Sequence, residues 1–256
     1  MYAPDPTAQL AALRAEIDAI DQQLASLLID RARVVDSVGA LKKQHWPASC
    51  HIRPGREGQM HRALFARFAG SGISPQAGLA IWRHIISSST HRESPLSILS
   101  LHGLRAEAEQ YFGTYVAQAE AASVQALLHA LMQGSSNIVI LPFPTEATSG
   151  IWREWLAQPA SAAFNIFAYM PVVGNGTPRA VALARVPCEP SGDDWSYLAD
   201  AEGNITYTPH FLTDNTVPQG SRLLGAHAAH LLYRECYDTR AHAKTRNIKH
   251  SPLCRR

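Results

Sequence analysis

The chain has 256 residues, of which 46% are hydrophobic and 17% are charged, and its formal net charge is +2. That length can bury one large core or two modest ones, and the small net charge gives no case for nucleic-acid binding. No stretch is long and apolar enough to cross a membrane, and the first six residues, MYAPDP, lack a basic head and an apolar run. We therefore expect a cytoplasmic protein without a membrane partner. The four cysteines are far apart and indicate neither a disulfide framework nor a zinc site: Cys50, Cys188, Cys236 and Cys254.

An arginine interrupts the apolar seam of the first predicted helix. Apolar residues recur in alternating steps of four and three, which is typical of a long helix packed against others. The seam positions are Leu13, Ile17, Ile20, Leu24, Leu27, Arg31, Val34, Val38 and Leu41. A guanidinium is costly to strand among apolar side chains, so Arg31 implies an anion inside the helical assembly, unless it reaches solvent or pairs with a core acid.

Two further cations belong to this helix. Lys42 lies eleven residues after Arg31 and, at about 100° per residue, only about 20° around the helix from it. Arg14 points roughly 100° away, so it cannot easily reach the same pocket from its own helix. It could reach a pocket that belongs to a partner chain.

Three helices are predicted in the first part of the chain. Thr7 is a candidate cap, Pro47 ends the first helix, and Pro75 suits the first position of the third. The predicted ranges are 7–44, 54–69 and 74–92. A first helix this long would expose its seam over half its length in a single chain. We therefore expect a helix-swapped homodimer, which agrees with Arg14 reaching across.

Five short pieces of this part resemble the all-helical chorismate mutases, which are compact three-helix subunits that intertwine as dimers. Each piece alone is weak, but their order and spacing are those of the family, over about the first 95 residues. The pieces are LAALRAEID from Leu10, Ile29-Asp30-Arg31, Val38-Gly39-Ala40-Leu41-Lys42, Arg56-Glu57 and Ile85-Ile86-Ser87-Ser88-Ser89.

The resemblance implies the rearrangement of chorismate to prephenate, which needs no nucleophile, metal or cofactor. Catalysis is then positioning plus electrostatics: arginines hold two carboxylates, and an ammonium meets the negative charge that grows on the ether oxygen. Arg31 and a partner's Arg14 would clamp carboxylates and Lys42 would face the ether oxygen. The remaining substrate-binding residues would be Arg56, Glu57 and Ser89, with Glu57 and Ser89 orienting the substrate hydroxyl and ring carboxylate.

Glu93 stands one turn after Ser89, where many members of the family have a glutamine that donates a hydrogen bond to the ether oxygen; some members have a glutamate. A glutamate can donate only when protonated, so we expect activity to rise toward mildly acidic pH and Glu93→Gln to flatten that profile. Arg53 stands where an aspartate is common. It either strengthens substrate capture or is a solvated loop charge.

After Pro95 the periodicity changes to that of an α/β domain. Strands are predicted at 96–101, 137–141, 164–169 and 179–184, and helices at 104–112, 123–132 and from 151. A helix at 223–233 would bring His227 and His230 to one side, but no third ligand is in view and we expect no metal. Gly174-Asn175-Gly176 lacks the third glycine of a dinucleotide fingerprint and is predicted to be a loop.

This second part is faintly similar to a prephenate dehydratase catalytic domain, which has a two-lobed, periplasmic-binding-protein-like fold. The similar pieces are IVILP from Ile138, Thr148-Ser149-Gly150, Thr177-Pro178-Arg179-Ala180 and PSGDD from Pro190. The dehydratase signature is a threonine-arginine-phenylalanine triplet whose threonine helps to expel the substrate hydroxyl. Pro178 takes that threonine's place and has no hydroxyl, so we expect a reduced domain that has lost the chemistry.

The sequence thus predicts a multidomain α and α/β protein: a helical chorismate mutase domain at 1–95, a degenerate dehydratase-like α/β domain at 96–238, and a basic, disordered tail at 239–256. We expect a homodimeric chorismate mutase that takes chorismate as its small-molecule substrate, without cofactor, metal, nucleic acid or membrane. Two alternatives remain open. The chain could be a bifunctional chorismate mutase and prephenate dehydratase, or the helical part could be only a dimerisation module of a non-enzymatic ligand sensor.

Overall fold

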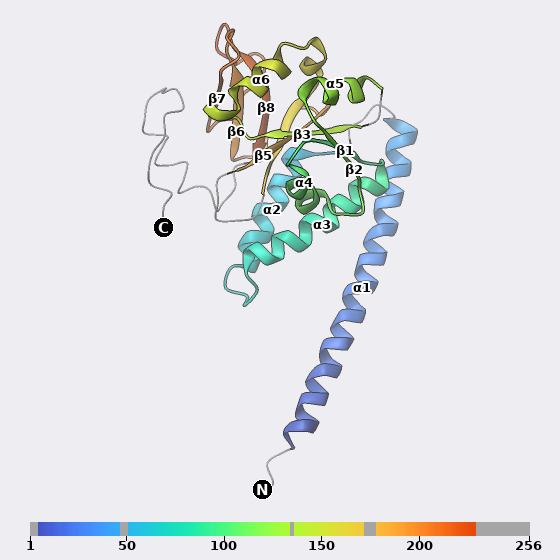
Figure 1. The fold of residues 1–256 in the computed structure, drawn as a ribbon. Coiled ribbons are helices and arrows are strands. Elements are labelled where there is room, and N and C mark those ends of the chain that lie inside the picture. The colour runs from blue at the N-terminus through green and yellow to red at the C-terminus, as the bar shows by residue number, and fades with distance from the viewer. Residues whose placement is uncertain (1–4, 47–50, 134–135, 172–177, 229–256) are drawn as a thin grey trace. The chain divides into compact units, whose positions relative to one another are not determined.

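The structure is a computed structural model, and the residues that it describes are 5–46, 51–133, 136–171 and 178–228 (Figure 1). Internal contacts divide the chain into two units. The first is Met1–Ser49 together with Arg92–Ser94, and the second is Cys50–His91 together with Pro95–Arg256. The predicted domain boundary at Pro95 follows the family pattern, whereas these contacts group two of the helices with the sheet. The predicted boundaries stay predictions.

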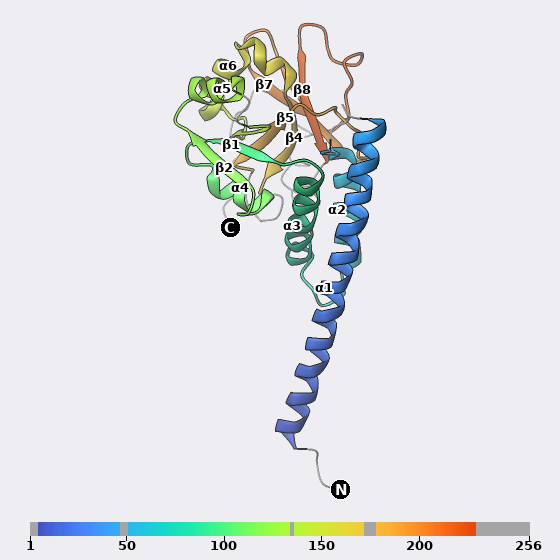
Figure 2. The ribbon, with the colours of Figure 1, turned by 90° about the vertical axis from the view of Figure 1, so that its right-hand side faces the viewer.

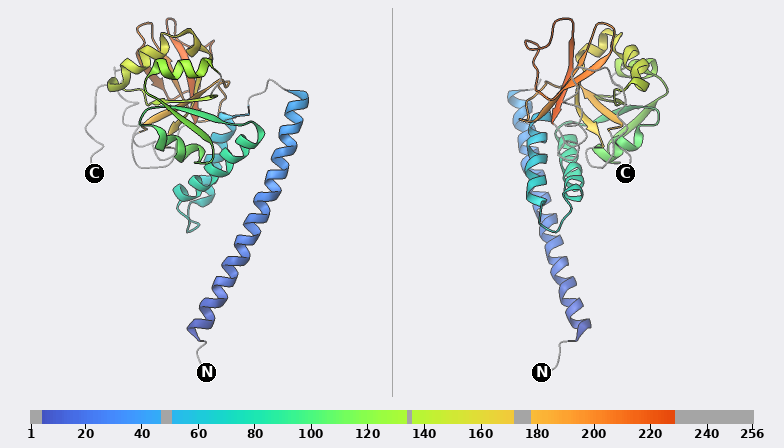
Figure 3. Two further views of the ribbon diagram at one scale, coloured as in Figure 1. Left: turned by 45° about the vertical axis from the view of Figure 1, so that its right-hand side comes forward. Right: turned by 90° about the vertical axis from the view of Figure 1, so that its left-hand side faces the viewer.

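The first unit is built on one long helix, α1 (Pro6–His45), which Figure 3 shows as uninterrupted. Pro6 takes a first-turn position, where its missing N–H costs nothing, and the Asp5 carboxylate accepts a hydrogen bond from the Thr7 N–H at 3.0 Å. The helix therefore begins one residue before the predicted start, and its cap is Asp5 rather than Thr7. Gly39 is the buried residue of α1.

The predicted seam of α1 is exposed within this unit. Its large apolar side chains, from Leu13 through Leu41, are between 39% and 64% exposed. A soluble helix rarely leaves a continuous apolar stripe of this length in water. The stripe therefore requires a cover that the first unit does not supply.

Two further helices precede the sheet, α2 (Pro54–Phe68) and α3 (Pro75–Glu93). The turn between them contains two glycines in the left-handed region, Gly70 at φ 77° and Gly72 at φ 85°, as a sharp turn requires. Both helices lie within one or two residues of the predicted ranges. The last two residues of α3, Arg92 and Glu93, belong to the first unit.

The second unit contains one mixed sheet of eight strands, in the order β2-β1-β3-β5-β4-β8-β6-β7. Neighbours β2, β1 and β3 run parallel, as do β4 and β8, and the other neighbours run antiparallel. The strands are β1 (Ser97–Leu101), β2 (Ala117–Ala121), β3 (Ile138–Pro142), β4 (Asn165–Met170), β5 (Ala180–Ala184), β6 (Asp194–Ala199), β7 (Ile205–Thr208) and β8 (Arg222–Ala228).

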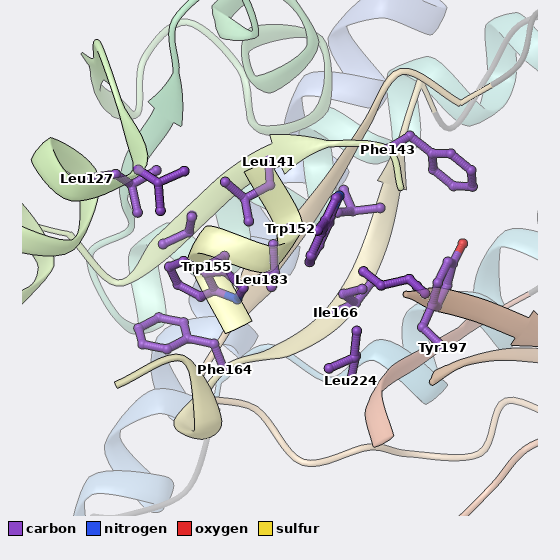
Figure 4. Close-up of a cluster of buried hydrophobic side chains, with 14 of the residues drawn as sticks. Leu127, Leu141, Phe143, Trp152, Trp155, Phe164, Ile166, Leu183, Tyr197 and Leu224 are labelled. Atoms are coloured by element: carbon purple, nitrogen blue, oxygen red, sulfur yellow. The ribbon is translucent and has the colours of Figure 1, made fainter. Parts of the chain in front are cut away.

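Helices cover both faces of this sheet (Figure 2). On one face, α4 (Arg105–Phe112) packs on apolar residues of β1, β3, β4 and β5. On the other, α5 (Val124–Met132) and α6 (Ser149–Leu156) cover the larger cluster, in which Trp152 and Trp155 are each 1% exposed (Figure 4). Two 3₁₀ turns, Glu146–Thr148 and Pro159–Ala163, flank α6. The predicted α/β architecture is thus confirmed.

The helix predicted at 223–233 was wrong for the residues that the structure describes, since 222–228 form strand β8. The leucines and alanines of this segment favour a helix locally, but they pair with β6 and meet β4, and burial outweighs that weak preference. Gly225 permits the close approach to β4, because a Cβ there would collide with the backbone of Ile166. His227 lies on this strand with its Nε2 2.8 Å from the hydroxyl of Tyr197, whereas His230 lies outside the described residues.

Besides β8, three strands were not predicted. β2 is mostly exposed at the sheet edge and consists of alanines, a glutamine and a glutamate, which have little preference for strands. β6 and β7 form a hairpin that follows the Pro190–Asp194 segment. Residues 174–176 and the basic tail at 239–256 lie outside the described residues.

Candidate active site

The first unit brings together two of the predicted catalytic residues. Lys42, near the end of α1, donates a hydrogen bond from Nζ to Oε2 of Glu93 at 2.6 Å. The Lys42 and Glu93 side chains are only 20% and 13% exposed. Gly39, one turn before Lys42, lies against Glu93, so α1 and the end of α3 approach each other closely at this point. A partly desolvated ammonium therefore lies beside an acid, and these are the two residues for which the resemblance predicts contact with the ether oxygen of the substrate.

A second ion pair fixes the same two segments. The Arg92 guanidinium donates to both carboxylate oxygens of Asp36, at 2.5 Å and 2.7 Å. These hydrogen bonds hold the pKa of Asp36 below its ordinary value and raise the pKa of Arg92. Because a bidentate pair fixes direction as well as distance, it sets the position of Glu93 relative to Lys42.

The two predicted arginines of α1 lie at different distances from Lys42. Arg31 is partly buried and eleven residues before Lys42, about 16 Å along the helix axis at 1.5 Å per residue. Arg14 is exposed and twenty-eight residues before Lys42, about 42 Å along the axis. No side chain spans the second distance, so Arg14 cannot serve the same substrate as Lys42 within one chain.

The other predicted residues belong to the second unit. Arg56 and Glu57 lie in the first turn of α2; Arg56 is exposed and Glu57 is partly buried. Ser89, on α3, is partly buried and its hydroxyl donates to the carbonyl of Ile85 at 2.7 Å. Arg53 is exposed and pairs with Glu189, which follows β5. Whether it contributes to substrate capture stays a prediction.

The structure adds a residue that the sequence reasoning missed. Arg83, in the middle of α3, is 4% exposed and donates to the Glu57 carboxylate and to the Tyr111 hydroxyl, the latter at 3.2 Å. Burial lowers the pKa of Arg83, but the interactions with Glu57 and Tyr111 outweigh the effect of burial, so the pKa of Arg83 is raised. The signal was present in the sequence, because Arg83 stands among buried positions spaced as one helix face. Those positions are Leu79, Arg83, Ile86, Ser87 and Thr90.

The dehydratase-like motif lies at the start of β5. Pro178 precedes Arg179, whose Nε lies 3.0 Å from Oε1 of the buried Glu107 on α4. Thr148 turns back on its own loop and donates to the carbonyl of Phe143 at 2.9 Å. The motif arginine is thus held by an acid of its own domain, and the motif residue at 178 offers no hydroxyl.

Comparison with known families fits this arrangement. Residues 13–94 match the family model of chorismate mutase type II. The resemblance predicted from the five motif pieces is thereby confirmed, and so is the order of a helical chorismate mutase segment followed by an α/β region. The match includes the segments that carry Lys42, Glu57, Arg83 and Glu93.

Two curated relatives are bifunctional chorismate mutase/prephenate dehydratases, from Stutzerimonas stutzeri and from Pseudomonas aeruginosa. Each is 28% identical over 141 residues, which is 52% of this chain and 38% of the relative. The chain thus spans well under half the length of the relatives that it matches.

One solved structure, described as GqqA, a novel type of quorum quenching acylase, aligns with 54% of this chain and 97% of its own. The TM-score is 0.36 and the identity is 11%.

Among the described residues, no group of three or more histidine, cysteine, aspartate or glutamate side chains is placed to hold a metal ion. Likewise, none of the helices that the structure describes is both long and apolar enough to cross a membrane.

Proposed function

We propose that the chain is a cytoplasmic chorismate mutase, which rearranges chorismate to prephenate in aromatic amino-acid biosynthesis. The observation that carries the proposal is the pairing of Lys42 with Glu93 at 2.6 Å inside the segment that matches chorismate mutase type II. These two residues are fifty-one positions apart in the sequence. They are also the two to which the resemblance assigns the ether oxygen of the substrate.

The reaction explains why this pair matters. One carbon–oxygen bond breaks while a carbon–carbon bond forms within the same molecule, so no proton, electron or leaving group passes to the enzyme. Negative charge grows on the ether oxygen, and an ammonium already in place stabilises it without reorganisation. Lys42 supplies that ammonium in the proposal, and protonated Glu93 supplies a second donor.

The remaining roles concern substrate capture. Arg31 and Arg56 would hold carboxylates, and Glu57 and Ser89 would orient the hydroxyl and the ring carboxylate. Bidentate arginine contacts favour the compact conformer in which the reacting carbons are close. Arg14 would complete the site of a partner chain, which the axial distance of about 42 Å from Lys42 supports.

A homodimer is therefore part of the proposal. The apolar seam of α1 is uncovered in its own unit, and a second α1 offers a stripe of matching length and spacing. Pairing two such helices would bury the seam of both and would carry Arg14 toward the site of the partner.

The α/β region would not dehydrate prephenate. The proposal rests here on Pro178, which replaces the hydroxyl that the dehydratase signature requires, and on Arg179, which is paired with Glu107. The relatives are named as bifunctional, so a bifunctional chain is the alternative outcome of the test.

The test is to incubate the purified chain with chorismate at acidic and neutral pH and to quantify prephenate and phenylpyruvate in the same tube by chromatography without acid treatment. Prephenate without phenylpyruvate is the expected result. Phenylpyruvate as well would contradict the argument from Pro178. No loss of chorismate at either pH would refute the proposed function and favour the ligand-sensor interpretation.

A further inference from the structure

A buried arginine on α3 lies behind one of the proposed substrate-binding residues. Arg83 is 4% exposed, and its helix face packs on the end of α4, where the Ser87 hydroxyl donates to the carbonyl of Phe112 at 2.6 Å. A buried guanidinium needs an anion and several acceptors. The structure supplies one carboxylate, that of Glu57, and one phenol, that of Tyr111.

The contact constrains Glu57. Arg83 donates to Oε2 of Glu57, and the Glu57 side chain is 12% exposed, so one carboxylate oxygen is taken up inside the protein. The second oxygen remains as an acceptor. An acceptor aligns a substrate hydroxyl only if its own rotamer is fixed, and an ion pair with a buried partner fixes it.

The α/β region holds Arg83 in turn. Tyr111, on α4, is 5% exposed; its hydroxyl lies 3.2 Å from a guanidinium nitrogen, and its ring centroid lies 4.3 Å from Arg83 Cζ. Burial raises the pKa of the Tyr111 phenol, so the hydroxyl stays neutral. A cation over an aromatic ring gains further stabilisation where water is excluded.

We propose that Arg83 is a positioning residue of the mutase reaction, which orients Glu57 toward the substrate hydroxyl and is itself oriented by Tyr111 of the α/β region. The inference rests on the proposed function and deepens it. It gives the α/β region a part in the mutase reaction that does not depend on dehydratase chemistry.

The experiment is a double-mutant cycle in the full chain, with kcat/KM for chorismate as the readout. Arg83→Met should lower kcat/KM by about 10- to 100-fold, the worth of a hydrogen bond to a charged group. In the background of Glu57→Gln the same change should cost less than about threefold. In Glu57→Gln the side-chain oxygen accepts from Arg83, so the amide NH₂ group faces the substrate hydroxyl. No acceptor for that hydroxyl is left for Arg83 to orient. A role of Arg83 that does not act through Glu57 would give the same factor in both backgrounds.

Arg62→Met is the matched control. Arg62 lies on α2 and ties that helix to the α/β region by donating to Ser191, with its nitrogen 3.1 Å from the Ser191 hydroxyl, but it makes no contact with Glu57 among those that the structure gives. It should change kcat/KM by less than about threefold while shifting the thermal unfolding midpoint. If Arg83→Met does not fold, Arg83→Lys and Tyr111→Phe decide in its place, with the same dependence on Glu57 expected.

The outcomes separate the two proposals. Equal factors in both backgrounds, or a loss for Arg62→Met as large as that for Arg83→Met, would overturn the role of Arg83 and leave the mutase activity standing. No chorismate turnover by the native chain would overturn the proposed function, and this inference with it.

Discussion

Replacing Glu93 by glutamine should make the reaction faster at neutral pH and independent of pH. In the proposed complex the Glu93 carboxylate lies about 3 Å from the ether oxygen, the distance of a donor that acts on developing charge. The Lys42 and Glu93 side chains are 20% and 13% exposed, which suits an effective dielectric of about 20. Half a charge on the ether oxygen then meets an ionised Glu93 with a repulsion of about 3 kcal/mol, or about 100-fold in rate.

The direction of the pH dependence follows from the protonation state in which Glu93 can donate a hydrogen bond. Only the protonated acid can donate a hydrogen bond to the ether oxygen, and raising the pH removes that proton. The rate of the native chain should therefore fall as pH rises, by roughly 100-fold between its two plateaus. Glutamine donates at every pH, so Glu93→Gln should be flat and should exceed the native rate above neutral pH.

The assay is the initial rate of chorismate loss at saturating substrate from pH 5 to pH 8, for native chain, Glu93→Gln and the control Glu146→Gln. Glu146 is an exposed glutamate in the 3₁₀ turn before α6 and should keep the native profile. A flat profile in the native chain, or a Glu93→Gln profile with the native slope, would refute the reasoning.

Three further predictions concern assembly and stability. Arg14→Ala and Lys42→Ala should each be inactive alone, whereas co-expression of the two variants should restore about one quarter of native activity. Half of the dimers are then mixed, and each mixed dimer has one of its two sites intact. Co-expressed variants no more active than the single ones would contradict a site shared between two chains. Leu24→Glu, on the exposed seam of α1, should abolish the dimer in light scattering, and the neighbouring Gln23→Glu should not; two dimeric variants would contradict pairing through the seam. Trp152→Ala should lower the free energy of unfolding, measured by urea titration, by about 3–5 kcal/mol, and Trp152→Phe should lower it by less, because Trp152 is 1% exposed. Equal small losses for the two variants would show that the apolar cluster around Trp152 does not stabilise the sheet.

Local signals in the sequence were sufficient for most helices. Proline and cap residues bound α1, α2 and α3, and their predicted ends lie within a residue or two of the observed ones. The buried strands β3 and β5 were also predicted, because a short continuous apolar run with prolines close by is typical of a buried strand. Segments that depend on distant partners were not predicted well. β8 has helix-favouring residues and becomes a strand only because β4 and β6 flank it.

The residues of the candidate site were likewise predicted only in part. Helix geometry placed Lys42 on the same stripe as Arg31, and the resemblance predicted that Glu93 contacts the substrate. In the structure, Lys42 donates a hydrogen bond to Glu93. Arg83 was missed although it stands on the buried face of α3. Its partners Glu57 and Tyr111 come from two other helices, and helix periodicity alone cannot say which acid a buried arginine meets.

The most direct test of the central claim compares Lys42→Ala with Lys43→Ala in the rate of prephenate formation from chorismate. Lys43 is the exposed neighbour of Lys42, so its loss removes an equal charge from the same turn of α1. The account predicts that Lys42→Ala loses roughly two to four orders of magnitude in kcat/KM, as for other transition-state contacts, and that Lys43→Ala stays within about threefold of native. Near-native turnover by a folded Lys42→Ala chain would contradict it.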